Sequence, residues 1–513
     1  MGESGPRLTR PHSGYKIRSM SSNDPAKVRV RFAPSPTGLL HIGGLRSALF
    51  NWLWARHTGG TFVLRIEDTD RARLVEGAEE QIYASLDLLG ITPDEGPVPG
   101  GSCAPYTQSE RREQGIYQQH ADQLVKSGSL YPCWCSSERL AKLREEAQAK
   151  GVAFKYDRHC LIPANRQPLS EPHVLRFRIP DKPETIVWDD AVRGHLEFKT
   201  ADLDDFVAVK ADGFPTYQFA NVVDDHLMHI THVLRADEWI PSTPKHLLLY
   251  QAFGWQPPIF AHLPAVLGPT GGKKLSKREG AQSVQEYITE GYLPEALRSY
   301  LATLGWNDGT TQEIYTTPEL IQRFTLDRIQ KSPARFDLER LTWVNGKMIR
   351  ELWQSDPDEL LKRCKPFWPP ASHQLPTPNR KDVLALVYDR LTKLSDLPEM
   401  TDFFFMDTKA VDVPNYRALL TKNYDAKTAQ THLRQLAQGL DRVEDSSWNV
   451  ETLENRIRDL TETARLKPGH FFGLIRIAVT GRTAAPGLFE TLAVLGKRAV
   501  LFRLDRAVRD LAN

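Results

Sequence analysis

The fold is decided by a stretch near the start of the sequence, VRVRFAPSPTGLLHIGG, which covers residues 28–44. Residues 28–33 alternate between apolar and basic side chains, a pattern that predicts a strand. A turn rich in Pro and Gly follows at 34–38, and apolar residues then recur with helical spacing over 45–53. After a Gly-Gly pair, the mostly apolar run 61–66 predicts a second strand. This order of strand, turn, helix and strand is typical of the opening of a parallel nucleotide-binding sheet.

The rest of the sequence changes character twice. Residues 106–213 are rich in Cys, Arg and Pro, with a polar helical stretch at 138–150 and short alternating segments such as 174–178. Parallel patterning resumes around 217–249, and beyond residue 277 the pattern is helical almost to the end. The predicted fold class is therefore α/β, with a Rossmann-like parallel-sheet domain that is interrupted by an inserted domain and followed by all-helical C-terminal domains.

Composition limits the classes of protein that fit. At 513 residues the chain is too long for a single core. Hydrophobic residues make up 41% and charged residues 25%, and no run approaches the roughly 20 apolar residues that cross a bilayer. The net charge of +2 gives no global nucleic-acid signature, so RNA affinity must come from local patches. Residues 456–513 form such a patch, with eleven Lys or Arg against five Asp or Glu.

The Pro- and Gly-rich turn has the chemistry of an anion site. Pro34 restricts the backbone, while Gly38, Gly43 and Gly44 allow a ligand to approach closely. The helix that follows presents an N-terminus that favours negative charge, and His41 can donate a hydrogen bond to a phosphate. A plain strand–helix connection with a capping histidine explains the turn alone equally well.

A second basic segment lies about 230 residues downstream. The run KLSKR occupies residues 274–278 and is preceded by glycines. Taken alone, a short cluster of this kind is usually a solvated basic turn. A distant cationic loop that closes on a nucleotide held by the first turn would instead suit chemistry at an α-phosphate.

Together the two segments resemble the signatures of class I aminoacyl-tRNA synthetases. The first is similar to the HIGH signature, in the HIGG variant usual for glutamyl-tRNA synthetases, and the second to the KMSKS loop. Gly44 stands where the last signature histidine would be, so His41 alone supplies an imidazole. The resemblance covers nearly all of residues 28–513. It implies ATP-dependent ligation of glutamate to tRNA-Glu, through glutamyl-adenylate and then transfer to the 3′-terminal adenosine.

The same resemblance assigns roles in catalysis. A glutamate carboxylate, already ionised at pH 7, attacks the α-phosphate of ATP, so catalysis is mostly alignment and stabilisation of phosphoryl charge. The implied catalytic residues are His41, Lys274 and Lys277. The implied ATP-binding residues are Pro34, His41, Gly43, Gly44, Glu238 and Lys277. Mg²⁺ is expected to accompany the ATP, held largely by phosphate oxygens and water.

Three further segments, 65–70, 215–226 and 233–239, resemble the glutamate-binding segments of the family. Arg31 and Arg235 are the implied partners of carboxylates, because guanidinium groups bind carboxylates bidentately. The implied glutamate-binding residues are Arg31, Ala33, Ser35, Glu67, Tyr217, Asn221, Arg235 and Trp239, of which Glu67 would accept from the α-ammonium.

Five cysteines, an odd number in a large chain, indicate a reducing compartment with thiols that are free or bound to a metal. Cys133, Cys135 and Cys160 match the spacing of a zinc knuckle in some bacterial glutamyl-tRNA synthetases, although Ile162 replaces the histidine of that site. Tyr156 resembles instead the ligand of a Tyr-x3-Cys pair in a related glutamyl-queuosine enzyme. Zinc held by Cys133, Cys135, Tyr156 and Cys160, and cysteines that merely pack, both stay open.

The resemblance also implies partners and domain roles. Substrates would be tRNA-Glu, L-glutamate and ATP, with tRNA-Gln as an open alternative, no membrane partner and a monomeric state. The predicted domains are a flexible N-terminal extension (1–27), two halves of the catalytic domain (28–105 and 214–260), an inserted acceptor-end-binding domain (106–213), a KMSKS-type loop with a helical connecting domain (261–349), and two helical anticodon-binding subdomains (350–405 and 406–513). Cytoplasmic localisation is predicted; a targeting role of residues 1–27 would place the protein in the mitochondrial matrix, and a start at Met20 is the other alternative.

Three rival interpretations are weighed against this one. A glutaminyl-tRNA synthetase would carry a different acidic motif at 65–70 and β-barrels at its C-terminus. The glutamyl-queuosine enzyme lacks an anticodon-binding region, for which about 160 residues are available here. A non-catalytic tRNA-binding paralogue would be expected to have lost His41 or Lys277, and both are present.

Overall fold

The computed structural model describes residues 28–269, 272, 273, 275, 282–373, 378–405, 420 and 424–512. These residues form two compact units. The first runs to Glu286 and also includes Leu297–Asp337, and the second comprises Tyr287–Ala296 and the residues from Leu338 onward. Among the described residues, we find no helix with the length and apolar content that crossing a bilayer requires.

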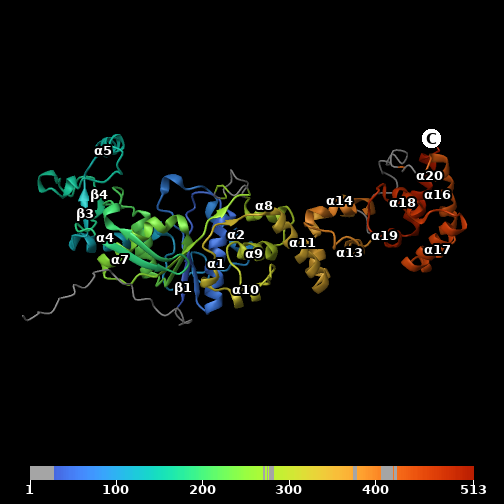
Figure 1. The fold of residues 1–513 in the computed structure, drawn as a ribbon, viewed down its shortest axis with the longest axis horizontal. Helices are drawn as coiled ribbons and strands as arrows, with labels where there is room; N and C mark the ends of the chain where they lie inside the picture. Colours follow the sequence, from blue (N-terminus) through green and yellow to red (C-terminus); the bar gives the residue numbers. More distant parts are fainter. Residues whose placement is uncertain are drawn as a thin grey trace, which may run out of the picture. The chain divides into compact units, whose positions relative to one another are not determined.

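A four-stranded parallel sheet forms the centre of the first unit (Figure 1). Its strand order is β2-β1-β8-β9, with β1 at Arg29–Phe32, β2 at Thr61–Leu64, β8 at His232–Ala236 and β9 at Ile259–Leu263. Helix α1 (Ile42–Thr58) connects β1 to β2 and packs on both strands and on β8, as the sequence pattern predicts. It ends at Gly59, whose φ of 63° is the left-handed conformation that glycine adopts without strain.

The neighbour of β1 on its other side is β8, although about 200 residues separate them in the sequence. The sheet is therefore interrupted by an insertion, which confirms the predicted fold class. Within the insertion, β3 (Leu130–Cys133), β4 (Val174–Phe177) and β7 (Val207–Val209) form a three-stranded antiparallel sheet, and β5 (Thr185–Asp190) and β6 (Gly194–Lys199) form a hairpin. The remaining elements of the first unit are α2 (Ala78–Leu88), α3 (Gln108–Glu113), α4 (Ile116–Lys126), α5 (Ser137–Ala149), α6 (Tyr217–Leu227), α7 (Thr243–Phe253), α10 (Thr317–Arg323), β10 (Val266–Leu267) and β11 (Ala334–Arg335).

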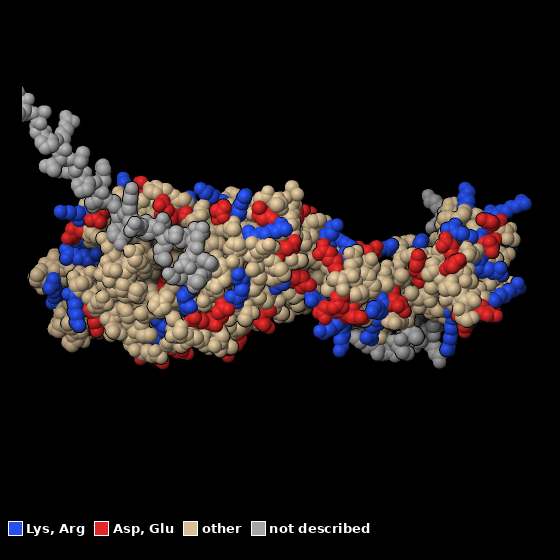
Figure 2. Space-filling model, turned by 90° about the horizontal axis from the view of Figure 1, so that it is seen from below, with Lys and Arg blue, Asp and Glu red and all other residues tan. Residues whose placement is uncertain are grey.

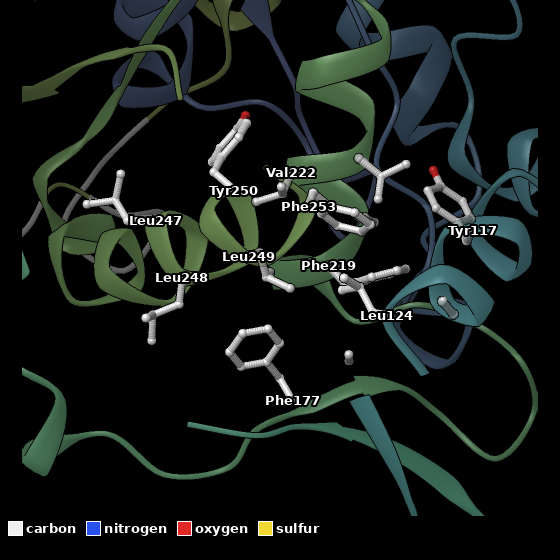
Figure 3. Packing of buried hydrophobic residues seen from close by; sticks show 14 of the residues in the cluster. Tyr117, Leu124, Phe177, Phe219, Val222, Leu247, Leu248, Leu249, Tyr250 and Phe253 are labelled. Atoms are coloured by element: carbon white, nitrogen blue, oxygen red, sulfur yellow. The ribbon is translucent and has the colours of Figure 1, made fainter. Parts of the chain in front are cut away.

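One apolar cluster joins the insertion to the parallel sheet. Phe177 from β4 and Leu124 from α4 lie in the same cluster as Phe219 from α6 and Leu249 from α7 (Figure 3). Full burial of a side chain of this size stabilises the fold by about 1.5–3 kcal/mol. The shared core therefore fixes the insertion against the sheet, which matters for the site below.

The second unit is helical throughout its described residues, in agreement with the sequence pattern. Its helices include α11 (Leu338–Ser355), α12 (Pro357–Arg363), α13 (Arg380–Ala385), α14 (Leu397–Thr401), α16 (Ala426–Asp441), α17 (Val450–Thr463), α18 (Pro468–Thr480), α19 (Leu488–Leu495) and α20 (Lys497–Asp510). Two short helices, α8 (Val284–Thr289) and α9 (Pro294–Thr303), include residues of both units.

Some of the basic residues near the C-terminus are paired with carboxylates. Figure 2 shows acidic and basic side chains mixed over the visible face of the helical unit. Arg458 contacts Glu454 at 2.6 Å, and Arg482 contacts Asp402 at 2.6 Å. A part of the excess of basic residues is therefore paired within the chain.

Candidate active site

A cavity of about 740 Å³ lies at the carboxyl ends of β1 and β8, where open parallel sheets bind ligands. Several segments far apart in the sequence contribute its walls, among them the turn after β1, the loop after β2, the start of α6 and the end of β8. Twelve of the residues predicted for ATP or glutamate line it: Arg31, Ala33, Ser35, His41, Gly43, Gly44, Glu67, Tyr217, Asn221, Arg235, Glu238 and Trp239.

The other predicted residues have different places. Pro34 is not in the cavity lining; its carbonyl accepts the backbone N–H of Glu67 at 3.0 Å, which ties the turn to the loop after β2. Lys274 and Lys277 lie outside the described residues. Leu275 between them is buried in the cavity wall, and its backbone N–H donates to the carbonyl of Val266 at 2.8 Å.

His41 is the N-cap of α1. Its Nδ1 accepts from the backbone N–H of Gly43 at 3.1 Å and of Gly44 at 3.3 Å. Because Nδ1 accepts, a neutral ring carries its proton on Nε2, which makes Nε2 a hydrogen-bond donor. A Cβ at Gly44 would lie 2.7 Å from Leu40 Cδ1, so a second signature histidine here would require Leu40 to move.

One wall of the cavity contains a buried network of ion pairs. Asp225 lies between two arginines, 3.0 Å from Arg31 Nε and 2.7 Å from Arg65 Nη1. Arg65 Nη2 lies 3.0 Å from Glu67, which also accepts from Asn221 at 3.1 Å. Burial favours the neutral carboxyl, but Arg31 and Arg65 outweigh it and lower the pKa of Asp225. For Glu67 burial outweighs the arginines and raises its pKa.

A second set of buried hydrogen bonds holds Asp224, the neighbour of Asp225 in α6. Asp224 accepts from Arg111 at 2.7 Å, from Gln108 at 2.8 Å and from the Tyr117 hydroxyl at 2.9 Å. All three donors follow β2 in the sequence and belong to α3 or α4. They anchor α6, which carries Asn221 into the cavity.

Arg31 pairs with a carboxylate, whereas Arg235 lies among uncharged groups. Only 6% of its surface is exposed, and none of the described carboxylates lies within ion-pair distance of it. Its hydrogen bonds go to uncharged groups: Tyr217 Oη at 3.2 Å, Thr243 Oγ1 at 2.9 Å, His262 Nε2 at 3.0 Å, His246 Nδ1 at 3.4 Å and the carbonyl of Trp239 at 3.3 Å. Burial lowers its pKa. A buried cation without a counter-ion is costly, so this position favours an anionic ligand.

Three further cations that the sequence did not single out line the cavity: Arg46, Lys210 and the exposed Arg73, which pairs with Asp70 at 2.6 Å. Arg46 from α1 donates to the carbonyl of Leu304 at 2.9 Å, and burial lowers its pKa to about 10. Lys210 Nζ donates to the carbonyl of Thr69 at 3.0 Å. The only sequence signal for Arg46 was a basic residue within an otherwise apolar helix face.

The predicted metal ligands converge away from this cavity. The thiols of Cys133, Cys135 and Cys160 lie within 4.8 Å of one another, and Tyr156 Oη lies 3.3 Å from Cys133 Sγ and 3.4 Å from Cys135 Sγ. Arg176 Nε donates to Cys133 Sγ at 3.3 Å. Burial opposes the thiolate, but hydrogen bonds from Tyr156 and Arg176 outweigh it and lower the pKa of Cys133. Three thiols and a phenol oxygen form a donor set that suits zinc.

Comparisons with known proteins place the chain in a family. Residues 27–343 match the family model for class I tRNA synthetases (E and Q), catalytic domain, and residues 359–508 match an anticodon binding domain. The chain is 47% identical over 500 residues to the glutamate–tRNA ligase of Roseiflexus castenholzii, a match that covers 94% of this chain and 97% of the relative. It is 45% identical to the enzyme of the same name from Chloroflexus aurantiacus, over 95% of this chain and 98% of the relative. A crystal structure of a glutamate tRNA ligase from Elizabethkingia meningosepticum, in complex with its amino acid, is similar with a TM-score of 0.84 and 34% identity, over 94% of this chain and 99% of that structure.

Proposed function

The chain belongs to the class I tRNA synthetases of the glutamate and glutamine type, and from this premise we propose that it ligates glutamate to tRNA-Glu in an ATP-dependent reaction. The observation that carries the proposal is the arrangement of Arg31, Arg235 and Glu67 around one cavity. Two guanidinium groups and one carboxylate complement the two carboxylates and one ammonium of glutamate.

We propose that Arg31 and Arg235 bind the two carboxylates and that Glu67 accepts from the α-ammonium. Ala33, Ser35, Tyr217, Asn221 and Trp239 complete the glutamate site. The attacking α-carboxylate needs no general base, since it is ionised at neutral pH. The chain then contributes mainly alignment of that oxygen with the α-phosphate.

The N-terminus of α1 is the proposed ATP site. Nε2 of His41 donates to a phosphate, beside the backbone N–H groups of the first helical turn and close to Gly43, Gly44 and Glu238. Pro34 supports the turn, and Lys277, aided by Lys274, neutralises charge on the departing pyrophosphate. Mg²⁺ accompanying the ATP would add positive charge at the phosphates.

The helical unit is the proposed site of tRNA recognition, because residues 359–508 match an anticodon binding domain. We propose the domain boundaries 28–105, 106–213, 214–260, 261–349, 350–405 and 406–513, with the insertion holding the acceptor end. The monomeric state and the cytoplasmic location stay predictions.

We propose a structural zinc ion at Cys133, Cys135, Cys160 and Tyr156. The support is the convergence of three thiols and a phenol oxygen at the end of β3, at the distances given above. Zinc there would hold together β3 and the segment around Cys160, which are 27 residues apart in the sequence.

A glutaminyl enzyme is the alternative within the same family. The helical second unit, in which the described residues form no strand, and the second, uncompensated arginine both favour glutamate.

The test is aminoacylation of purified tRNA-Glu and tRNA-Gln with radiolabelled glutamate or glutamine. We expect transfer of glutamate to tRNA-Glu. Transfer of glutamine would establish the alternative, and no transfer of glutamate to either tRNA would refute the proposal. Transfer of glutamate to both tRNAs would identify tRNA-Gln as a second substrate.

A further inference from the structure

Arg235 is the end of a buried chain of hydrogen bonds that begins in the insertion. Its Nε donates to His262 Nε2 at 3.0 Å, and His262 Nδ1 lies 2.5 Å from Asp190 Oδ2. His262 belongs to β9 of the parallel sheet, and Asp190 is the last residue of β5 in the inserted hairpin. Both side chains are buried, and neither lines the cavity.

The chemistry of Arg235 fixes the protons in this chain. Arginine Nε always carries hydrogen, so His262 Nε2 must accept, and the ring proton is on Nδ1, where it donates to Asp190. The carboxylate of Asp190 is itself held firmly, since its Oδ1 accepts from the backbone N–H of Val192 at 3.0 Å, of Arg193 at 2.9 Å and of His262 at 3.1 Å. The backbone N–H of Ala191 also donates to Phe260 at 2.8 Å, which joins the hairpin turn to β9.

The imidazole of His262 separates the Arg235 guanidinium from the carboxylate of Asp190. Asp225 contacts Arg31 directly and compensates it, whereas Asp190 is one ring away from Arg235. The guanidinium is therefore oriented by a carboxylate without forming an ion pair with it. Its partners in the cavity wall, Tyr217 Oη and the carbonyl of Trp239, are at 3.2 and 3.3 Å, and these longer bonds can yield to a ligand.

We propose that Asp190 and His262 are positioning residues. Asp190 fixes the tautomer of His262, and His262 holds the Arg235 guanidinium in the orientation that a carboxylate of glutamate requires. The inserted hairpin thereby completes the amino acid site of the parallel sheet. This inference rests on the proposed function and adds to it two residues that touch neither substrate nor reacting atoms.

The substitution Asp190→Asn tests the tautomer directly. The amide oxygen can keep the three backbone donors, while the amide nitrogen then faces His262 Nδ1 as a donor. His262 must respond by carrying its proton on Nε2, where it opposes the N–H of Arg235. In the aminoacylation assay we expect the KM for glutamate to rise about 10- to 100-fold, with the KM for ATP unchanged and the Tm within about 4 °C of the wild type.

A second pair of variants keeps the test valid if Asp190→Asn does not fold. His262→Gln retains an oxygen that can accept from Arg235 Nε, and His262→Leu does not. The KM for glutamate should be at least about 5-fold higher in the Leu variant than in the Gln variant. His195→Ala, an exposed change on the adjacent strand β6, is the matched control and should leave both KM values unchanged.

The outcomes separate this inference from the proposed function. A wild-type protein that transfers no glutamate refutes the proposed function. If the wild type is active, a glutamate KM within twofold of wild type in Asp190→Asn overturns the positioning role. An equal rise in the KM for ATP would also overturn it, since that result indicates a general structural defect.

Discussion

The two arginines proposed to bind glutamate, Arg31 and Arg235, are buried to a similar degree and stabilised in different ways. Arg31 belongs to a network in which Asp225 also contacts Arg65, so its charge is compensated before any ligand binds. Arg235 has only uncharged partners among the described residues, and burial lowers its pKa. The wall that contains Arg31 therefore contributes to folding as well as to binding. The other wall contains Arg235, a buried charge without a counter-ion, which can bind an anionic ligand.

The largest effect should follow from breaking the compensated wall. Asp225→Asn removes the carboxylate between Arg31 and Arg65 and leaves two buried cations close together. Breaking a buried ion pair on one side typically costs about 3–5 kcal/mol, so we expect a loss of that order in the free energy of unfolding. Urea denaturation followed by circular dichroism measures it. A loss under about 1 kcal/mol would show that Asp225 is not the partner that the two arginines require.

The two walls should also differ in their response to acid. Burial lowers the pKa of His246 and of His262, beside Arg235, below the ordinary histidine value of about 6.5. Below about pH 6.5 these two histidines take up protons in the unfolded chain but remain neutral in the folded protein. The free energy of unfolding therefore decreases as the pH falls. The lowered pKa of Asp225 adds to the free energy of unfolding. This contribution is fully present above pH 3.8 and is lost only at more acidic pH.

The variant His246→Gln isolates this effect. It should lose less stability between pH 7 and pH 5 than the wild type does, because one buried group that resists protonation is absent. The measurement is urea denaturation at pH 7, 6 and 5, with Asp225→Asn as the comparison from the other wall. An equal loss in His246→Gln and wild type over this range would contradict the expectation.

The smallest change in stability should come from Arg235→Met. Removing an uncompensated cation from a neutral environment leaves no carboxylate without a partner, and the side chains are similar in length. We expect the free energy of unfolding to stay within about 1 kcal/mol of the wild type or to increase. Arg31→Met is the matched control, and it should destabilise the protein because Asp225 loses a partner. A larger loss in Arg235→Met than in Arg31→Met would reverse the comparison.

Local patterns predicted the elements well. Residues 28–33 and 61–66 were predicted as strands, and the structure has β1 at Arg29–Phe32 and β2 at Thr61–Leu64. The polar stretch 138–150 corresponds to α5 at Ser137–Ala149. Alternation and helical spacing are properties of neighbouring residues, so the sequence alone is sufficient for such predictions.

Contacts across long separations were not predictable in the same way. Arg65 and Asp225 are 160 residues apart, and Asp190 and His262 are 72 residues apart. Their partners depend on which strands become neighbours and on how the inserted hairpin packs against β9, and single-residue patterns carry no such information. Twelve residues of the cavity were predicted because they lie in segments that resemble a known family, whereas Arg46, Lys210 and the network behind the wall were not.

If the uncompensated charge of Arg235 binds the side-chain carboxylate of the substrate, the preference for glutamate over glutamine must differ between the wild type and Arg235→Met. The two amino acids have the same length, and only one carries a side-chain charge that an uncompensated guanidinium would favour. We predict that the ratio of kcat/KM for glutamate to that for glutamine falls at least about 100-fold in Arg235→Met, since truncating one partner of a buried charge pair costs about 2–5 kcal/mol. An unchanged ratio would contradict the claim that the charge of Arg235 is kept for the side-chain carboxylate of glutamate.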